Sequence, residues 1–173
     1  MTLGKQIRAI LLLPVLVTIF VPAGILCLTR SLCPGWGLYF PLLVLPYSLG
    51  ALLVGGGLAL LCRTVALFIN VGRGTLAPWD PPQELVVSGP YCYVRNPMIS
   101  GVLAIVLGEA ALLGSCALAA WFLLFLLGNA IYFPLSEEPG LERRFGEAYL
   151  AYKENVPRWL PRLTPWQPQP EEE

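Results

Sequence analysis

The chain contains no histidine and few charged residues. Histidine is the commonest metal ligand and a frequent general base, so other residue types must fill these roles in any site. Charged residues make up 13% of the 173 positions, whereas a soluble domain carries about 25%. The formal net charge is zero, and we therefore predict no nucleic-acid partner.

The cysteines are scattered along the chain. No two of them form a CxxC pair, so their spacing supports neither a zinc site nor a thioredoxin-like motif, and we predict no metal centre. We expect structural thiols buried in a membrane instead. The five residues are Cys27, Cys33, Cys62, Cys92 and Cys116.

Apolar residues are abundant, at 56% against about 45–50% in soluble domains. This composition predicts an integral membrane protein. The first apolar run, at 9–28, has about 20 residues, which is longer than the 7–15 residues of a signal-peptide core and sufficient to cross a bilayer. We expect it to be retained as the first span.

The second span lies within 38–71, and two windows compete for it. One is 38–62. The other ends near Val71 and leaves Arg63 to extend toward the membrane interface. Pro41 and Pro46 disfavour an early helix start, so the later window is preferred.

The next apolar stretch, 99–135, is too long for a single span. As one helix it would extend about 55 Å at 1.5 Å per residue, whereas the hydrocarbon core is about 30 Å thick. Gly114 and Ser115 are the best hinge within it. We therefore predict a tight hairpin of two helices, 97–113 and 116–135.

Basic residues then suggest an orientation. With four spans and both termini in the cytoplasm, every lysine and arginine except Arg30 lies on the cytoplasmic side. The predicted fold class is an all-α integral membrane protein with four transmembrane helices.

Two further segments follow from local patterns. The segment 141–152 has an apolar stripe at helical spacing, which predicts a cytoplasmic amphipathic helix at the membrane surface. The tail 164–173 is rich in proline and acidic residues, which predicts disorder. We expect one membrane domain at 1–163.

Charged residues beside the hairpin are the first candidates for chemistry. Arg95, Asn96 and Pro97 are typical of a helix start, with Asn96 as the N-cap and a helix dipole that favours anions. Glu137 and Glu138 follow the second helix of the hairpin and should return to the same membrane level. Together they could hold a zwitterionic ligand. The alternatives are a lipid-anchoring arginine and a salt bridge that only fixes the hairpin.

Glu109 is a carboxylate within the third predicted span. An ionisable residue at membrane depth usually faces the bundle interior. Glu109 could line a cavity for a lipid substrate, or it could be held protonated in a packing contact.

Two separated motifs together resemble the isoprenylcysteine carboxyl methyltransferase and phospholipid methyltransferase family of small membrane enzymes, and 72–82 is similar to a loop of bacterial members. The resemblance covers about 70–162. The first motif comprises Val87-Ser88-Gly89-Pro90-Tyr91, Tyr93-Val94-Arg95-Asn96-Pro97-Met98 and Gly101. The second comprises Glu137-Glu138, Leu141, Phe145-Gly146, Tyr149, Tyr152 and Val156-Pro157-Arg158.

The resemblance implies an S-adenosylmethionine-dependent methyltransferase, with a lipid or other apolar small molecule as acceptor, in a bacterial inner membrane. It implies Arg95 and Glu138 as catalytic residues. It also implies a set of cofactor-binding residues: Tyr93, Arg95, Asn96, Pro97, Gly101, Glu137, Glu138, Leu141 and Tyr149.

The chain departs from the family pattern at two positions. Asn96 stands where the best-known members have histidine, and Ile99 stands where they often have tyrosine. An NADPH-dependent reductase of the sterol-reductase type, whose C-terminal motif is similar, and an inactive membrane scaffold of the same fold are the alternative functions.

Overall fold

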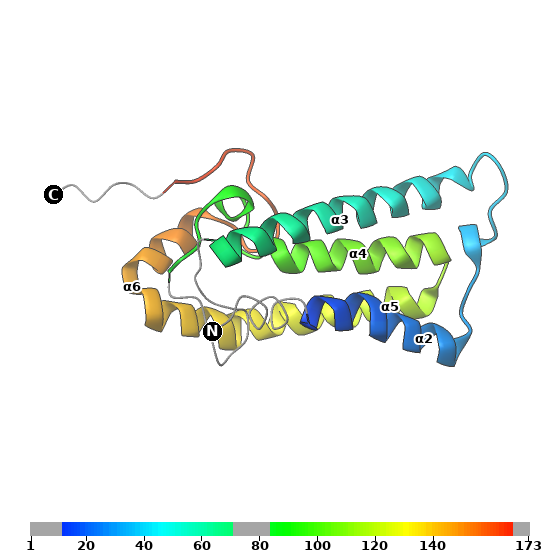
Figure 1. Ribbon diagram of the computed structural model, residues 1–173, viewed down its shortest axis with the longest axis horizontal. Helices are drawn as coiled ribbons and strands as arrows, with labels where there is room; N and C mark the ends of the chain where they lie inside the picture. The colour runs from blue at the N-terminus through cyan, green and yellow to red at the C-terminus, as the bar shows by residue number, and fades with distance from the viewer. Residues whose placement is uncertain (1–11, 71–83, 168–173) are drawn as a thin grey trace.

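The computed structural model describes residues 12–70 and 84–167, and these residues form helices and connecting segments without a β-strand. The predicted loop at 72–82 therefore lies outside the described residues. Figure 1 shows α3, α4, α5 and α2 running along one common direction, with α6 turned away at one end. The elements in order are η1 Leu16–Phe20, α2 Val21–Thr29, η2 Pro34–Gly37, α3 Val44–Asn70, η3 Gly89–Cys92, α4 Pro97–Leu113, α5 Cys116–Tyr132, η4 Phe133–Glu137 and α6 Glu138–Asn155.

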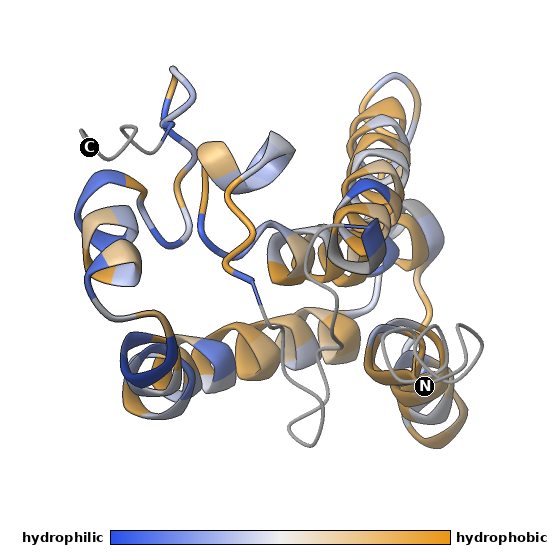
Figure 2. Cartoon of the chain, turned by 60° about the vertical axis from the view of Figure 1, so that its left-hand side comes forward, coloured by the Kyte–Doolittle hydropathy of each residue, from blue (hydrophilic) through white to orange (hydrophobic). Residues whose placement is uncertain are grey.

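Three of the described helical stretches are long and apolar enough to cross a membrane: Leu12–Thr29, Val44–Leu67 and Cys116–Asn155. In the last, the apolar part precedes Glu137. α4 is a shorter apolar helix of 17 residues. Large apolar side chains point outward, and Leu52 and Leu124 are 72% and 65% exposed, as expected where lipid is the solvent. Figure 2 shows apolar colour along these helices and hydrophilic residues around α6 and the C-terminal segment.

The hairpin between α4 and α5 confirms the predicted hinge. Gly114 ends α4 in the left-handed conformation, at φ 59°, which glycine adopts without strain. Ser115 begins the next helix, and its hydroxyl accepts a hydrogen bond of 3.3 Å from the Leu118 amide. The observed helix limits, Pro97–Leu113 and a start at Cys116, are the predicted ones.

Glycines bring α3 and α4 into close contact. A Cβ on Gly57 would lie 2.7 Å from the carbonyl oxygen of Gly101, and a Cβ on Gly108 would lie 2.8 Å from that of Gly50. Both helices thus carry glycines seven residues apart, and the pairing is antiparallel. Small residues at such a contact allow two backbones to pack closely in a membrane.

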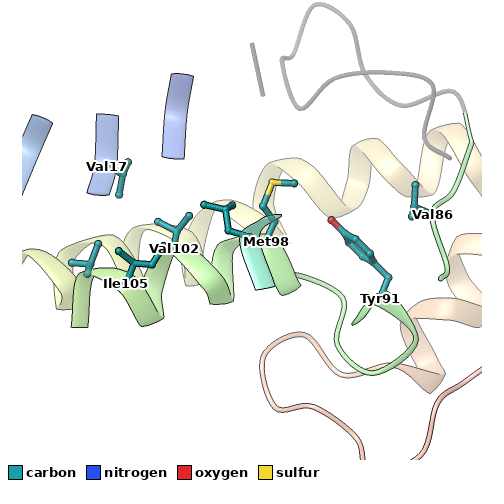
Figure 3. Packing of buried hydrophobic residues seen from close by; sticks show 8 residues of the cluster. Val17, Val86, Tyr91, Met98, Val102 and Ile105 are labelled. Carbon is teal, nitrogen blue, oxygen red and sulfur yellow. The ribbon is translucent and has the colours of Figure 1, made fainter. Parts of the chain in front are cut away.

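The buried core runs along the face of α4 toward the first helix and α5. Val102 and Val106 are fully buried, and they belong to a cluster with Val17 and Met98. Figure 3 shows Val17, Met98, Val102 and Ile105 along this face, with Tyr91 beyond the start of the helix. The core therefore reaches the loop that precedes α4.

Two expectations about the C-terminal third were wrong. The chain does not begin a separate regular helix at 141, because α5 continues through the wide turn η4 into α6, which is kinked at Gly146 (φ 54°, ψ −131°). The tail is also not wholly disordered from 164. The Trp166 amide donates a hydrogen bond of 2.9 Å to the Cys92 carbonyl, so the packed part of the chain extends beyond 163. Residues 168–173 of the predicted tail lie outside the described residues.

Candidate functional site

The loop before α4 is fixed by a short 3-10 turn, Gly89–Cys92. Gly89 begins the turn at φ 57°, and Tyr91 and Cys92 are buried. The Tyr152 hydroxyl donates a hydrogen bond of 2.7 Å to the carbonyl oxygen of Tyr91, and thereby ties the loop to α6. Arg95 follows this turn and extends toward the same helix.

Glu138 is the centre of a charged cluster, although it is only 3% exposed. Its Oε1 accepts hydrogen bonds from Arg95 Nη1 at 3.0 Å and from Arg158 Nε at 2.7 Å. Lys153 Nζ lies 3.4 Å from Glu138 Oε2 and 2.6 Å from Glu142 Oε1. One buried carboxylate therefore joins the start of α4, the end of α6 and the segment after it.

The cluster sets the two neighbouring carboxyl groups to different protonation. Burial alone would raise the pKa of Glu138, but the hydrogen bond from Arg158 and the charges of Arg95, Arg158 and Lys153 hold that pKa below its ordinary value. Glu137 lacks such partners, and burial together with the negative charge of Glu138 raises its pKa to about 7. Glu138 is thus an anion at neutral pH, whereas Glu137 can exchange a proton.

Backbone hydrogen bonds hold the C-terminal segment against the same loop. The Arg95 amide donates to the Pro157 carbonyl at 2.9 Å, and the Arg162 amide donates to the Tyr93 carbonyl at 3.0 Å. With the Trp166 bond to Cys92, these contacts line the segment up along the loop. The end of the chain thereby becomes part of the site's framework.

Aromatic residues of α6 form the apolar side of the cluster. Tyr149 and Tyr152 are each 3% exposed and pack with Val156, and Leu141 and Phe145 lie against them. Burial, then the charge of Glu138, raises the pKa of Tyr149, while the Arg95 guanidinium opposes this rise. The predicted stripe of the C-terminal helix is therefore buried against protein.

Other predicted site residues are placed differently. Asn96 stands at the N-cap position of α4, but its side chain makes no capping hydrogen bond. Pro97 occupies the first turn, as predicted, and is buried. Gly101 lies against Gly57 in the contact between α3 and α4, which explains a glycine there by packing. Tyr93 lines a cleft beside Arg63.

Two cations of the cluster, Lys153 and Arg158, were not among the predicted site residues. Arg158 was within reach of the sequence, because it ends the Val156-Pro157-Arg158 element of the second motif. Lys153 carries no such signal. It was assigned only to the polar side of an amphipathic helix, and its contact with Glu138 depends on the kinked path of α6.

Glu109 does not belong to the cluster. It lies 12 residues beyond Pro97 in α4, about 18 Å along the helix at 1.5 Å per residue. Its Oε2 is buried and has no hydrogen-bond partner in the part of the chain that the structure describes. That distance from Pro97 makes a direct role in chemistry near Arg95 untenable.

The fold and the cluster define a helical membrane protein with a charged site at one end of its bundle. Residues 45–148, which are more than half of the chain, match the phospholipid methyltransferase family, and the chain belongs to that family. It is thus a member of a methyltransferase family whose apolar helices are compatible with membrane insertion. The match includes Arg95, Glu137 and Glu138 but ends before Tyr149. No curated protein and no solved structure matches the chain.

Proposed function

We propose that the protein transfers a methyl group from S-adenosylmethionine to a lipid or other apolar acceptor. The observation that carries this proposal is the buried cluster of Arg95, Glu138 and Arg158 in a chain of the phospholipid methyltransferase family. A structural salt bridge needs only one arginine. Here a second arginine and a lysine surround the same carboxylate, and this arrangement leaves positive charge available for an anionic group.

The side chains present fit the cofactor. Arg95 Nε is buried without a hydrogen-bond partner among the described residues, which is the environment expected of a donor that meets a ligand. Arg95 and Arg158 would hold the carboxylate of the cofactor. Glu137 and Glu138 would hold its amine or ribose hydroxyls, and Tyr149 and Leu141 would supply apolar contact.

Bound S-adenosylmethionine supplies an electrophilic methyl group for in-line displacement. The chain's own residues contribute orientation and the exclusion of water. Arg95 and Glu138 are proposed as the catalytic pair because their ion pair fixes the start of α4 against α6. With no histidine in the chain, Glu137 is the candidate base for an amine acceptor. Its pKa of about 7 suits a carboxylate that takes up one proton near neutral pH.

We further propose four spans, with α4 as the third and both termini in the cytoplasm. Support comes from the tight hairpin, because a helix that follows α4 in the opposite direction returns the chain to its starting side. Cys33 lies beside the outer end of this hairpin, where its amide donates to Leu113, and Cys92 lies at the other end. An impermeant thiol reagent added outside cells should label Cys33 before Cys92. The reverse order would refute this topology.

The direct test of the cofactor is calorimetry on the full chain in detergent, with S-adenosylhomocysteine and NADPH titrated separately. S-adenosylhomocysteine should bind, and Arg95→Ala should weaken it about ten- to a hundredfold, because a charge-assisted hydrogen bond contributes about 1.5–3 kcal/mol. Arg143→Gln is the matched control, since Arg143 is exposed on α6. Binding of NADPH instead would favour the reductase, and binding of neither would favour the scaffold.

The acceptor can be identified with lipid extracts of cells that have or lack the protein. Each extract is incubated with methyl-labelled cofactor and purified protein. A labelled lipid that accumulates only with extract from the deficient cells identifies the acceptor. Labelling that is equal with and without active protein would argue against a methyltransferase.

A further inference from the structure

Arg63 lies at the same level of the bundle as Arg95, on the neighbouring helix. α3 and α4 are antiparallel and pair Gly50 with Gly108 and Gly57 with Gly101. Continuing this register by six residues brings Arg63 beside the start of α4. It also lies within four residues of the end of the apolar stretch Val44–Leu67. This depth corresponds to the boundary between hydrocarbon and headgroups, where a long cationic side chain can reach lipid phosphates.

A cleft of about 460 Å³ opens beside this arginine, within the range of about 300–1,000 Å³ typical of ligand sites. Arg63 is its only charged lining residue, and it has no ion pair or hydrogen bond among the residues that the structure describes. Tyr93 and Gln167 add neutral polar groups. The cleft is lined by Arg63, Gly89, Pro90, Cys92, Tyr93, Pro165 and Gln167.

The loop before α4 separates this cleft from the Glu138 cluster. Tyr93 lines the cleft, whereas Arg95, two residues later, binds Glu138. Two residues of extended chain span at most about 7 Å, so the two sites lie on neighbouring parts of one short loop. None of Arg95, Glu137, Glu138 and Tyr149 lines the cleft. A ligand in it would leave the proposed cofactor residues free.

We propose that this cleft binds the phosphate of a phospholipid headgroup, with Arg63 as the cationic ligand. A phosphodiester carries one negative charge, which matches one unpaired guanidinium in a cleft with no carboxylate. The assignment deepens the proposed function and rests on it in one respect: the phosphate held here would place a phospholipid acceptor beside the methyl-transfer cluster. Arg63 is then a substrate-positioning residue.

Binding measured on the full chain in a phosphate-free detergent tests this proposal. Three probes are titrated: dihexanoyl phosphatidylethanolamine, dihexanoylglycerol, which lacks the phosphate, and inorganic phosphate. The wild type should bind the phospholipid at least tenfold more tightly than the other two. Equal binding of phospholipid and dihexanoylglycerol would overturn the proposal without any variant. Equal binding of inorganic phosphate would show a free-anion site and would overturn the assignment to lipid.

Variants then identify the ligand side chain. Arg63→Gln should weaken phospholipid binding about ten- to a hundredfold, Arg63→Lys should retain part of it, and the control Arg143→Gln should retain all of it. Dihexanoylglycerol and S-adenosylhomocysteine should bind as in the wild type, which also shows that the variants are folded. Unchanged phospholipid binding in Arg63→Gln would leave Arg63 as an interfacial anchor and refute the site. Loss of S-adenosylhomocysteine binding in the wild type itself would refute the proposed function, whereas the lipid titrations would still decide this cleft.

Discussion

Neutralising Glu138 should loosen the whole cytoplasmic end of the structure. Glu138→Gln keeps the shape of the side chain but removes the charge that Arg95, Arg158 and Lys153 share. Two charge-assisted hydrogen bonds are worth about 1.5–3 kcal/mol each, and neutral bonds about half as much. Lys153 is 37% exposed, and water screens its contribution. The expected loss is therefore about 2–4 kcal/mol of local stability.

Cys92 reports on this opening, because its thiol is buried in the loop that the cluster holds. In a variant whose other cysteines are replaced by alanine, the rate of maleimide labelling at Cys92 should follow the population of the opened loop. A loss of 2–4 kcal/mol corresponds to a rate about 30 to 1,000 times faster, since about 1.36 kcal/mol is a factor of ten. Helical content should stay unchanged, because the spans satisfy their own backbone hydrogen bonds.

Glu142→Gln is the matched control for Glu138→Gln. Glu142 also pairs with Lys153, at 2.6 Å, but both side chains are about one-third exposed. Such pairs contribute about 0–1 kcal/mol, so Cys92 labelling should accelerate less than about fivefold. If Glu138→Gln labels no faster than this control, the buried carboxylate does not hold the loop and the proposed clamp is wrong.

Three other changes test separate contacts. Gly57→Leu should destabilise the protein by about 1–3 kcal/mol in thermal unfolding, because the new side chain meets the Gly101 carbonyl, whereas Gly55→Leu, in open space, should not. Deleting the chain after Leu163 should speed Cys92 labelling through the lost Trp166 contacts, and deletion after Gln167 should not. Because the pKa of Glu137 is raised to about 7, its contribution to stability should be lost as pH rises from about 4.5 to 7, and Glu137→Gln should flatten that slope in unfolding measurements.

The hairpin could be predicted because its determinants are local or set by length. An apolar stretch that exceeds the membrane thickness must fold back, and Gly114 and Ser115 supply a C-cap and an N-cap at adjacent positions. The proximity of Arg95 and Glu138 followed from the same geometry, because both flank a hairpin of two similar helices. The 3.0 Å ion pair confirms that proximity.

The remaining contacts depend on tertiary structure. The glycines of α3 and α4 have the same seven-residue spacing, but a spacing within each helix does not state which glycines pair. The attachment of Trp166 to Cys92 is a backbone hydrogen bond, and any residue except proline could make it. Proline-rich, acidic composition was therefore a poor guide to where the packed chain ends.

The wide turn η4 explains why one carboxylate of the Glu137-Glu138 pair is buried among cations and its neighbour is not. Pro134 and Pro139 lie in and just after this turn, and neither has an amide hydrogen to donate to the helix. A turn widened by one residue rotates everything after it by about 100° around the helix axis. Glu138 is thereby directed to Arg95 and Arg158, while α5 and α6 remain one continuous helix. The helix that we propose as the fourth span thus carries the central carboxylate directly, and its tilt in the membrane would be transmitted to the site.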